Sequence, residues 1–273
     1  MEIEFTKMHG LGNDFVVVDC REREIKNPEK LAIKLCDRHF GIGADGLILV
    51  LPSSKADFRM RIFNPDGSEP EMCGNGIRCF AKFVRDNGFD SNKFEVETLA
   101  GIIKPEMVDG MVRVDMGEPI LKPKDVPANF DGEMAVDKEL DIAGRKLRIT
   151  AVSMGNPHAV SFVDDLEGFP TAEIGSKVEL HPTFPRKINV EFVQVLSNDV
   201  IKVAVWERGA GITLACGTGA CASLVASVLN KKISARKATV ILPGGELYIE
   251  WADNNHVYMT GPAETVFTGT INV

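Results

Sequence analysis

A six-residue motif occurs twice in this chain, and the distance between its copies recurs at other positions. The copies are 71–76 (EMCGNG) and 214–219 (LACGTG), so Cys73 and Cys216 lie 143 positions apart (216 − 73). A constant offset over polar, apolar and glycine positions predicts a duplicated structural unit. The same offset relates Gly12-Asn13 to Gly155-Asn156, Phe63 to Trp206, Leu99 to Leu242 and Gly101 to Gly244.

Most of the chain has the pattern of short strands. Runs rich in Val, Ile and Phe are separated by turn residues, which is typical of strands. Because few helices intervene, we expect an α+β fold with curved mixed or antiparallel sheets. The predicted strands are Phe15–Asp19, Leu47–Leu51, Phe58–Phe63, Phe94–Thr98, Val112–Met116, Lys146–Met154, Asn189–Leu196, Val200–Trp206, Ala238–Leu242, Glu246–Trp251 and Val257–Thr260.

Three segments have the pattern of helices. The first begins at Asn27-Pro28 and is expected to run to about Phe40. The second begins after Cys73 and ends at Gly88, and the third begins after Cys216. The third is apolar nearly all round, and such a helix is buried on most sides. We therefore expect a sheet to wrap around it and, by the repeat, another sheet to wrap around the second helix.

The length of 273 residues is enough for two domains of ordinary size. Pro119, Pro123 and Pro127 fall in the polar stretch Pro119–Glu133. Proline-containing polar stretches are typical of connections. We therefore predict that this stretch links the two halves.

Each motif places a thiol at the start of a predicted helix. Unpaired backbone N–H groups and the helix dipole favour negative charge there, so we expect lowered pKa values for Cys73 and Cys216. The following glycines let a ligand approach these N–H groups, which can bind a carboxylate. Two such helix starts could hold one α-carboxylate while the thiols act on opposite faces of the neighbouring Cα. Such a pair of acid/base groups suits the inversion of a stereocentre.

Other cysteines and glycines fit structural roles. Cys20, Cys36, Cys79 and Cys221 are expected in the core, as most free cysteines are. The C-x5-C and C-x4-C spacings differ from the C-x2-C of zinc sites, so no metal is expected. Residues 41–46 match G-x-G-x-x-G but follow a helix and lead into a strand, the reverse of a dinucleotide site. We interpret this segment as a tight turn with its backbone near a site, and expect no cofactor.

Four asparagines beside predicted turns or strand ends are candidate ligands. They are Asn13, Asn64, Asn156 and Asn189, and asparagine at such places commonly serves the turn itself. Asn13 and Asn156 share the 143-residue offset, which favours a role in binding substrate.

An acid, a base and a histidine lie near the second motif. Glu207 and Arg208 follow a predicted strand, and they could bind an ammonium and a carboxylate or form an exposed pair. His158 could exchange a proton with a thiol, although a single histidine more often has a structural role.

Nearly end to end, the chain resembles the diaminopimelate epimerase family. The similarity is carried by residues 9–15 (HGLGNDF), 63–68 (FNPDGS), 72–78 (MCGNGIR), 154–158 (MGNPH), 189–192 (NVEF), 207–211 (ERGAG) and 215–219 (ACGTG). The last two segments are the most specific, because related proline racemases differ around their second cysteine. The family fold has two pseudo-symmetric α+β halves, each a sheet wrapped round a central helix, with the final strand returning to the first half. The resemblance implies an N-terminal half of 1–117 with 262–273 and a C-terminal half of 118–261.

The resemblance also implies a role for each candidate residue. Cys73 and Cys216 would be the acid/base thiols of an isomerase that interconverts LL- and meso-diaminopimelate without a cofactor, assisted by His158 and Glu207. Some family members have Gln where this chain has Gly46, so no side-chain contact is assigned there. The implied substrate-binding residues are Gly74, Asn75, Gly217 and Thr218 at the reacting carboxylate, Asn64 and Glu207 near the reacting centre, and Asn13, Asn156, Asn189 and Arg208 at the distal end.

Composition and charge narrow the possible partners. A net charge of −8 disfavours a nucleic-acid partner. No segment approaches the roughly 20 apolar residues of a membrane span, and the N-terminus lacks the pattern of a signal peptide. Six cysteines in a chain of this length do not indicate a disulfide framework, so we expect a cytoplasmic protein. The family implies a homodimer with a small-molecule substrate from lysine and peptidoglycan-precursor biosynthesis.

Three alternatives remain at this point. A racemase of the same fold would act on L-proline and not on diaminopimelate. A pyridoxal-phosphate racemase would be yellow as purified. A non-catalytic amino-acid-binding protein would bind its ligand without exchanging the α-proton.

Overall fold

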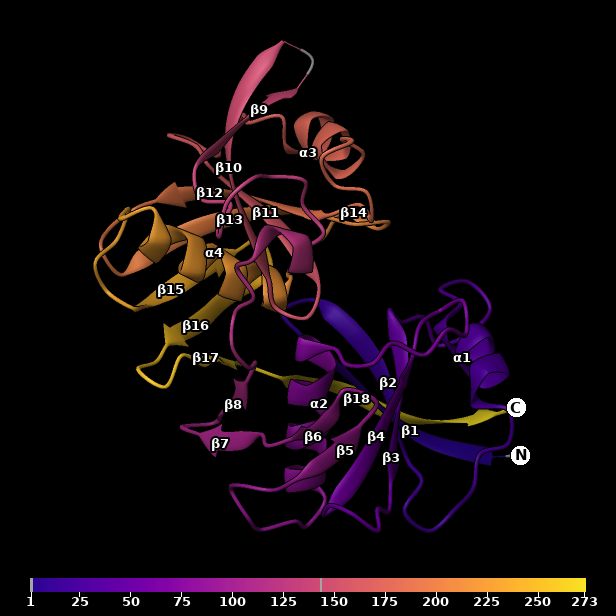
Figure 1. The fold of residues 1–273 in the computed structure, drawn as a ribbon. Helices are drawn as coiled ribbons and strands as arrows, with labels where there is room; N and C mark the ends of the chain where they lie inside the picture. The colour runs from indigo at the N-terminus through magenta and orange to yellow at the C-terminus, as the bar shows by residue number, and fades with distance from the viewer. Residues whose placement is uncertain (1, 143) are drawn as a thin grey trace. The chain divides into compact units, whose positions relative to one another are not determined.

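The computed structural model describes residues 2–142 and 144–273, and the chain divides into two compact units. Unit 1 comprises Met1–Asp115 with Thr260–Val273, and unit 2 comprises Met116–Met259. Each unit combines one mixed sheet with α-helices, which confirms the predicted α+β class (Figure 1).

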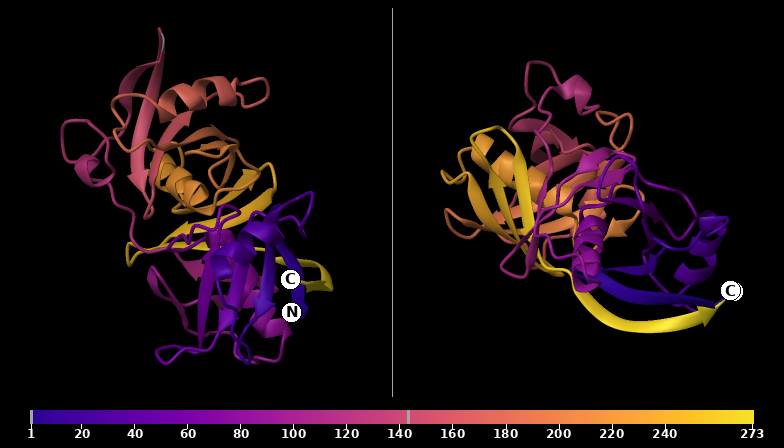
Figure 2. Two further views of the ribbon diagram at one scale, coloured as in Figure 1. Left: turned by 90° about the vertical axis from the view of Figure 1, so that its right-hand side faces the viewer. Right: turned by 90° about the horizontal axis from the view of Figure 1, so that it is seen from below.

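The sheet of unit 1 has the strand order β18-β1-β2-β3-β4-β5-β6. β2 is parallel to β3 and β4 is parallel to β5, whereas the other neighbours are antiparallel. β18 pairs with β1 in the register Glu2↔Asn272, so both chain ends lie in this unit (Figure 2). The strands are β1 (Glu2–Gly10), β2 (Asn13–Asp19), β3 (Gly46–Leu51), β4 (Phe58–Phe63), β5 (Val96–Thr98), β6 (Gly101–Ile103) and β18 (Glu264–Asn272). Unit 1 also contains the hairpin of β7 (Glu106–Val108) and β8 (Met111–Asp115), which is not part of this sheet.

Alternating side chains of the unit 1 strands pack against different helices. Val16, Val18, Leu47 and Leu49 cluster with helix α1 (Pro28–Cys36). The intervening Ile48 points toward helix α2 (Gly74–Asp86), since a Cβ at Gly76 would lie 3.5 Å from its Cδ1. This is the period of two expected of a strand buried on both faces.

Helix α1 begins at Pro28 as predicted but ends at Cys36 and not near Phe40. Asp37 leaves the helical region, with ψ 121°, and its carboxylate accepts the N–H groups of His39 and Phe40 at 2.7 Å. A side chain that satisfies nearby backbone donors in this way competes with continuation of the helix.

The sheet of unit 2 contains the order β17-β16-β15-β13-β12-β11-β10-β9, and β14 pairs with β13. β11 is parallel to β12 and β13 is parallel to β15. The strands are β9 (Lys138–Ile142), β10 (Arg145–Ser153), β11 (Pro157–Phe162), β12 (Asn189–Val195), β13 (Val200–Glu207), β14 (Gly211–Ile212), β15 (Lys237–Leu242), β16 (Gly245–Trp251) and β17 (Val257–Gly261), whose end enters unit 1.

Helix α4 (Gly217–Leu229) is enclosed by this sheet, which confirms the prediction from its all-round apolar sequence. It contacts β10, β11, β12, β13, β15 and β16 (Figure 1). Helix α3 (Thr171–Glu179) was not predicted. Its central Gly175 lowers intrinsic helix propensity. The structure explains this glycine, because a Cβ there would lie 2.5 Å from Cβ of Trp206.

The two units repeat one pattern, which confirms the duplication. Pairing from β1 to β6 runs antiparallel, parallel, antiparallel, parallel, antiparallel, and the path β10-β11-β12-β13-β15-β16 repeats this series. The bounds of α3 lie 143 positions after those of α1 (171 − 28 and 179 − 36). The bounds of α4 lie 143 positions after those of α2 (217 − 74 and 229 − 86).

The prediction that Pro119–Glu133 links the two halves is wrong. The units divide between Asp115 and Met116, and the stretch belongs to unit 2. It contains a 3-10 helix, η1 (Pro123–Asp125), and its Val126 is buried in the core of the unit. Within the residues that the structure describes, no helix is both long and apolar enough to cross a membrane.

Candidate active site

Both motif cysteines are N-cap residues. Cys73 precedes α2 and Cys216 precedes α4, each with extended backbone. Each Sγ accepts a hydrogen bond from the backbone N–H three residues later, Gly76 or Gly219, at 3.4 Å. The residues between, Gly74-Asn75 and Gly217-Thr218, open the helices, and the N–H groups of a first helical turn point toward the helix start. Each unit thus presents a thiol beside backbone donors that suit an anion.

In unit 1 the structure brings Cys73, Asn13 and Asn75 together. The side-chain carbonyl of Asn13 accepts from Asn75 Nδ2 at 3.0 Å and faces Cys73 Sγ at 3.9 Å. Asn64 stands at the end of β4 in a turn of its own, where its Nδ2 donates to Ser68 Oγ at 2.9 Å.

A charged cluster that sequence reasoning missed holds Asn13 in place. Asp45 accepts from Asn13 Nδ2 at 2.9 Å, and Arg38 bridges Asp45 and Asp14 at 2.7 and 2.8 Å. Buried Lys7 pairs with Asp14 at 2.7 Å and also donates to the carbonyl of Gly43. The 41–46 segment is therefore the predicted turn, and it supplies Asp45 to the site. In the sequence, Asp45 lies between an alanine and the start of an apolar strand, and this charged residue at an apolar place is the signal that could have identified it.

This cluster makes stability depend on pH. Burial alone would raise the pKa of Asp14, but hydrogen bonds from Arg38 and Lys7 lower it to about 2. The stabilisation is complete above the ordinary value of 3.8 and is lost as pH falls toward 2. Between pH 5 and pH 2.5, the free energy of unfolding measured in urea should fall by about 1 kcal/mol more for the wild type than for Asp14→Asn. The difference is no larger because solvent partly screens these ion pairs. Asp90→Asn, at an exposed carboxylate, is the matched control and should follow the wild type. Equal losses in all three proteins would contradict the assignment.

In unit 2 the structure brings Cys216, Thr218 and Glu207 together. Cys216 Sγ lies 3.5 Å from Thr218 Oγ1, and the Glu207 carboxylate accepts from Thr213 at 2.6 Å and from the Cys216 thiol. Burial is the main reason that the pKa of Glu207 is raised, although the Thr213 hydroxyl opposes it.

The expected low pKa of Cys216 is wrong for this structure. Burial, followed by the nearby carboxylates of Glu207 and Glu191, raises its pKa well above the ordinary value. Hydrogen bonds from Thr218 and from the N–H of Gly219 oppose the shift without offsetting it. The helix start favours a thiolate, but desolvation and two acids outweigh that effect.

His158 is fully buried and contacts Asn156 and Glu191. Its Nε2 lies 2.9 Å from Asn156 Oδ1, and its Nδ1 lies 2.7 Å from Glu191 Oε1. Sequence reasoning did not assign a role to Glu191, although a carboxylate within a buried strand is rare without a partner. The structure therefore joins the predicted residues His158 and Asn156 directly and adds Glu191 as the second partner of the histidine.

Asn189, at the start of β12, and Arg208, directly after β13, form a further pair. Asn189 donates to the carbonyl of Pro157 at 2.9 Å and accepts the backbone N–H of Arg208 at 2.9 Å. The Arg208 guanidinium donates to the carbonyl of Arg186 at 3.1 Å. Asn189 thereby fixes the turn in which Arg208 lies.

Gly219 lets a carboxylate and a thiol approach the first turn of α4. A Cβ there would lie 2.7 Å from Glu191 Oε1 and 3.3 Å from Cys216 Sγ. Alanine favours a helix by about 1 kcal/mol, but this contact with a buried, ion-paired carboxylate should outweigh it. Gly219→Ala should lower the free energy of unfolding by about 1–3 kcal/mol in urea titrations. The matched variant Gly76→Ala meets the end of Ile62 at 3.0 Å, a flexible neighbour, and should cost less. Equal costs for the two variants would contradict this account.

The other cysteines are core residues, as predicted. Cys20, Cys36, Cys79 and Cys221 are buried, and burial raises the pKa of Cys79 to about 12. Gly46 begins β3, where a Cβ would lie 2.9 Å from the carbonyl oxygen of Phe63. In the described residues, 2–142 and 144–273, no cluster of three His, Cys, Asp or Glu side chains could hold a metal ion.

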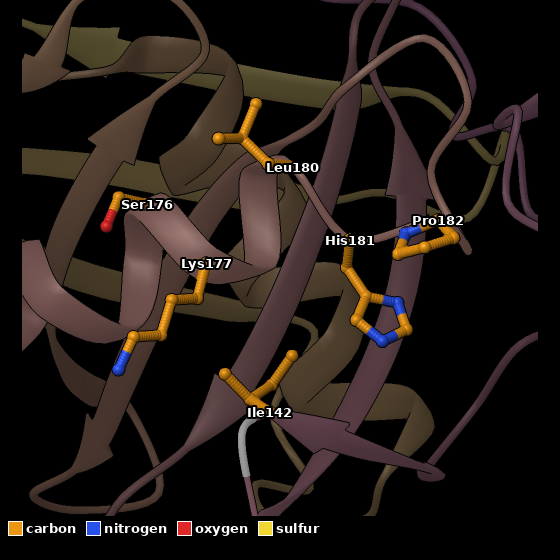
Figure 3. A pocket seen from close by; sticks show the side chains of 6 residues that line it. All are labelled: Ile142, Ser176, Lys177, Leu180, His181 and Pro182. Atoms are coloured by element: carbon orange, nitrogen blue, oxygen red, sulfur yellow. The ribbon is translucent and has the colours of Figure 1, made fainter.

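A cavity of about 390 Å³ lies beside α3 and not beside either thiol motif (Figure 3). Its lining is Ile142, Ser176, Lys177, Leu180, His181 and Pro182, without a candidate residue.

Solved structures of similar fold include enzymes with distant sequences. A phenazine biosynthesis protein of the PhzF family from Bacillus anthracis matches with a TM-score of 0.73 and 18% identity, covering 100% of both chains. A hydroxyproline epimerase from Agrobacterium vitis, with bound trans-4-hydroxy-L-proline, matches with a TM-score of 0.66 and 15% identity, covering 99% of this chain and 91% of its own. These similarities support the two-halved fold.

Sequence relatives are much closer. A diaminopimelate epimerase from Acetivibrio thermocellus is 58% identical over 278 residues, covering 99% of both chains. Another, from Desulfitobacterium hafniense, is 58% identical over 279 residues, covering 98% of both. The family model for diaminopimelate epimerase matches residues 5–122 and 150–266. The chain therefore belongs to the diaminopimelate epimerase family.

Proposed function

We propose that this protein interconverts LL- and meso-diaminopimelate by proton transfer at Cα, with Cys73 and Cys216 as its two acid/base groups. The observation that carries the proposal is the pair of N-capping thiols at equivalent positions of two duplicated units. Membership of the diaminopimelate epimerase family supplies the substrate.

The reaction needs a base and an acid of the same kind. One thiolate takes the α-proton, the electron pair remains on Cα, and the other thiol delivers a proton to the opposite face. The protein is left with the two thiols in exchanged protonation states, and exchange with solvent restores them. The α-proton is a weak acid, so the carbanion needs stabilisation by the N–H groups of Gly74-Asn75 and Gly217-Thr218. No cofactor is required in this scheme.

Glu207 is the proton partner that we assign to Cys216. Its carboxylate contacts the thiol, and burial raises the pKa values of both groups. The hydrogen bond from the thiol places the carboxylate where it can accept or return the thiol proton. We also assign Asn64 and Glu207 to the reacting end of the substrate, His158 to assistance of the thiols, and Asn13, Asn156, Asn189 and Arg208 to the distal end.

The cellular setting follows from the same proposal. We infer a cytoplasmic homodimer that supplies lysine and peptidoglycan-precursor biosynthesis, as expected from the family. Neither a membrane nor a nucleic acid takes part in the reaction.

The test is NMR of LL-diaminopimelate incubated with reduced protein in deuterated water. We expect deuterium at Cα together with meso product. L-Proline serves as the competing substrate, and exchange of L-proline alone would select a racemase. A yellow protein would indicate pyridoxal phosphate, and binding without exchange would indicate a binding protein. Each of these results would overturn the proposal.

A further inference from the structure

A set of polar side chains is buried beneath the start of α4. His158 on β11, Glu191 on β12 and Ser223 on α4 are all 0% exposed. Their equivalents 143 positions earlier, in unit 1, are buried apolar residues: Phe15, Ile48 and Phe80 (158 − 15, 191 − 48, 223 − 80).

The two units have different side chains at these three equivalent positions, although they share one architecture. The same architecture packs well in unit 1 with three apolar side chains at these places. Burial of charged and polar groups costs free energy relative to such packing. The polar side chains in unit 2 are therefore not a requirement of the fold, and the contacts of His158 and Glu191 indicate what this pair does.

The contacts of His158 are the basis for its charge state. Nδ1 faces the carboxylate oxygen Oε1 of Glu191 at 2.7 Å, and Nε2 faces the amide oxygen Oδ1 of Asn156 at 2.9 Å. With an oxygen acceptor at each ring nitrogen, this arrangement of the Asn156 amide corresponds to the imidazolium, which has two N–H groups. Within the described part of the chain, the other carboxylate oxygen of Glu191 has no hydrogen-bond partner. His158 is thus the counter-charge that permits Glu191 to be buried.

We propose that Glu191 is a positioning residue, which holds His158 as an imidazolium and through it fixes the amide of Asn156. With its carbonyl occupied by His158, Asn156 keeps its Nδ2 hydrogens for a bound carboxylate. A neutral His158 would accept from Asn156 Nδ2 and turn the amide, so that the carbonyl oxygen would face that carboxylate. The charge on one buried side chain thereby selects which end of Asn156 meets the substrate. The substrate role of Asn156 rests on the proposed function.

Other titratable groups of unit 2 interact electrostatically with the pair of His158 and Glu191. Glu207 at the end of β13 and Cys216 at the start of α4 both experience the charge of Glu191, and Glu207 also experiences that of His158. Because both nitrogens of His158 already donate, it contributes to the thiols through its charge and not as a base. The close approach of Glu191 to Gly219 places this ion pair beside the first turn of α4.

The charge state can be read without catalysis. Nitrogen-15 NMR of the histidine side chains at pH 7, with the His158 signals assigned by their loss in His158→Gln, should show two protonated ring nitrogens. Glu191→Gln should give a neutral ring with one unprotonated nitrogen, because the amide cannot balance the charge. Ser223→Ala, which alters the same buried layer without removing charge, should keep the wild-type signals. A neutral His158 in the wild type, or an unchanged ring in Glu191→Gln, would overturn the proposal.

Kinetics test the consequence for the substrate. Glu191→Gln should raise KM for diaminopimelate about 10-fold or more, with a smaller change in kcat, because Asn156 binds the non-reacting end. Ser223→Ala should leave KM within about twofold. An unchanged KM in Glu191→Gln with a neutral His158 would refute the positioning role. If the wild type does not turn over diaminopimelate, the proposed function fails, while the NMR result still decides the ion pair.

Discussion

Cys73→Ala and Cys216→Ala should each lower the rate at which LL- and meso-diaminopimelate interconvert by about 10²–10⁴-fold. In the proposed mechanism each thiol is the acid/base group for one face of Cα, so inversion needs both. Each substitution also removes the Sγ that accepts the N–H of Gly76 or Gly219, a loss of about 1 kcal/mol that is too small to unfold the protein. Formation of meso product from LL-diaminopimelate, followed by NMR with each variant, measures the effect.

The same helices provide the controls. Cys79 on α2 and Cys221 on α4 are fully buried thiols with no assigned role, and burial raises the pKa of Cys79 to about 12. Cys79→Ala and Cys221→Ala should keep activity within a few-fold while losing about 1–2 kcal/mol of stability. Retention of more than a tenth of wild-type activity by Cys73→Ala or Cys216→Ala would refute the two-thiol mechanism.

Arg78→Met should lower the free energy of unfolding by about 3–5 kcal/mol. The Arg78 side chain is fully buried in unit 1. It donates to the carbonyl of Gly74 at 3.0 Å, to Asn75 Oδ1 at 3.0 Å and to the carbonyl of Pro262 at 3.1 Å. Methionine of similar length would fill the space but leave these acceptors unsatisfied, at about 1–3 kcal/mol each before relaxation.

Urea unfolding followed by circular dichroism measures this loss. Arg85→Met, about two turns further along α2, removes a partly exposed guanidinium that donates to the carbonyl of Phe89 at 3.2 Å, and should cost less than about 1 kcal/mol. Because Arg78 also orients Asn75, its variant should lose activity even at temperatures where it remains folded. A loss of stability no greater than that of Arg85→Met would contradict this account.

Much of the fold could be predicted because its patterns are local. The helix starts at Pro28, Gly74 and Gly217 follow from capping and periodicity, and the buried strands follow from apolar runs. Strand β18 has no local strand pattern, because most of its residues are exposed and pairing with β1 makes it a strand, so only the family resemblance indicated a final strand there. Helix α3 was missed because Gly175 weakens its local signal, although the 143-residue offset from α1 contained the information.

The candidate site was predictable where a motif marks it. Cys73, Cys216 and their neighbouring glycines stand at helix starts, so local sequence identifies them. Glu191 and Asp45 were missed because their partners, His158 and Asn13, lie more than 30 positions away in the chain. A carboxylate in or beside an apolar strand is unusual, but the local sequence does not show which partner it meets.

The α+β class and the placement of one thiol at each of two helix starts could be predicted from the chain alone, because capping and periodicity act between residues close in the chain, and the constant offset of 143 positions revealed the duplication. The electrostatics of the site depend instead on tertiary packing. The pKa of Cys216 is raised, contrary to the expectation from its helix start, because burial and two carboxylates from other strands outweigh the helix N-terminus. His158 is paired with Glu191 because neighbouring parallel strands bring them together. Burial and charge depend on what packs around a group, and that is set by residues far away in sequence.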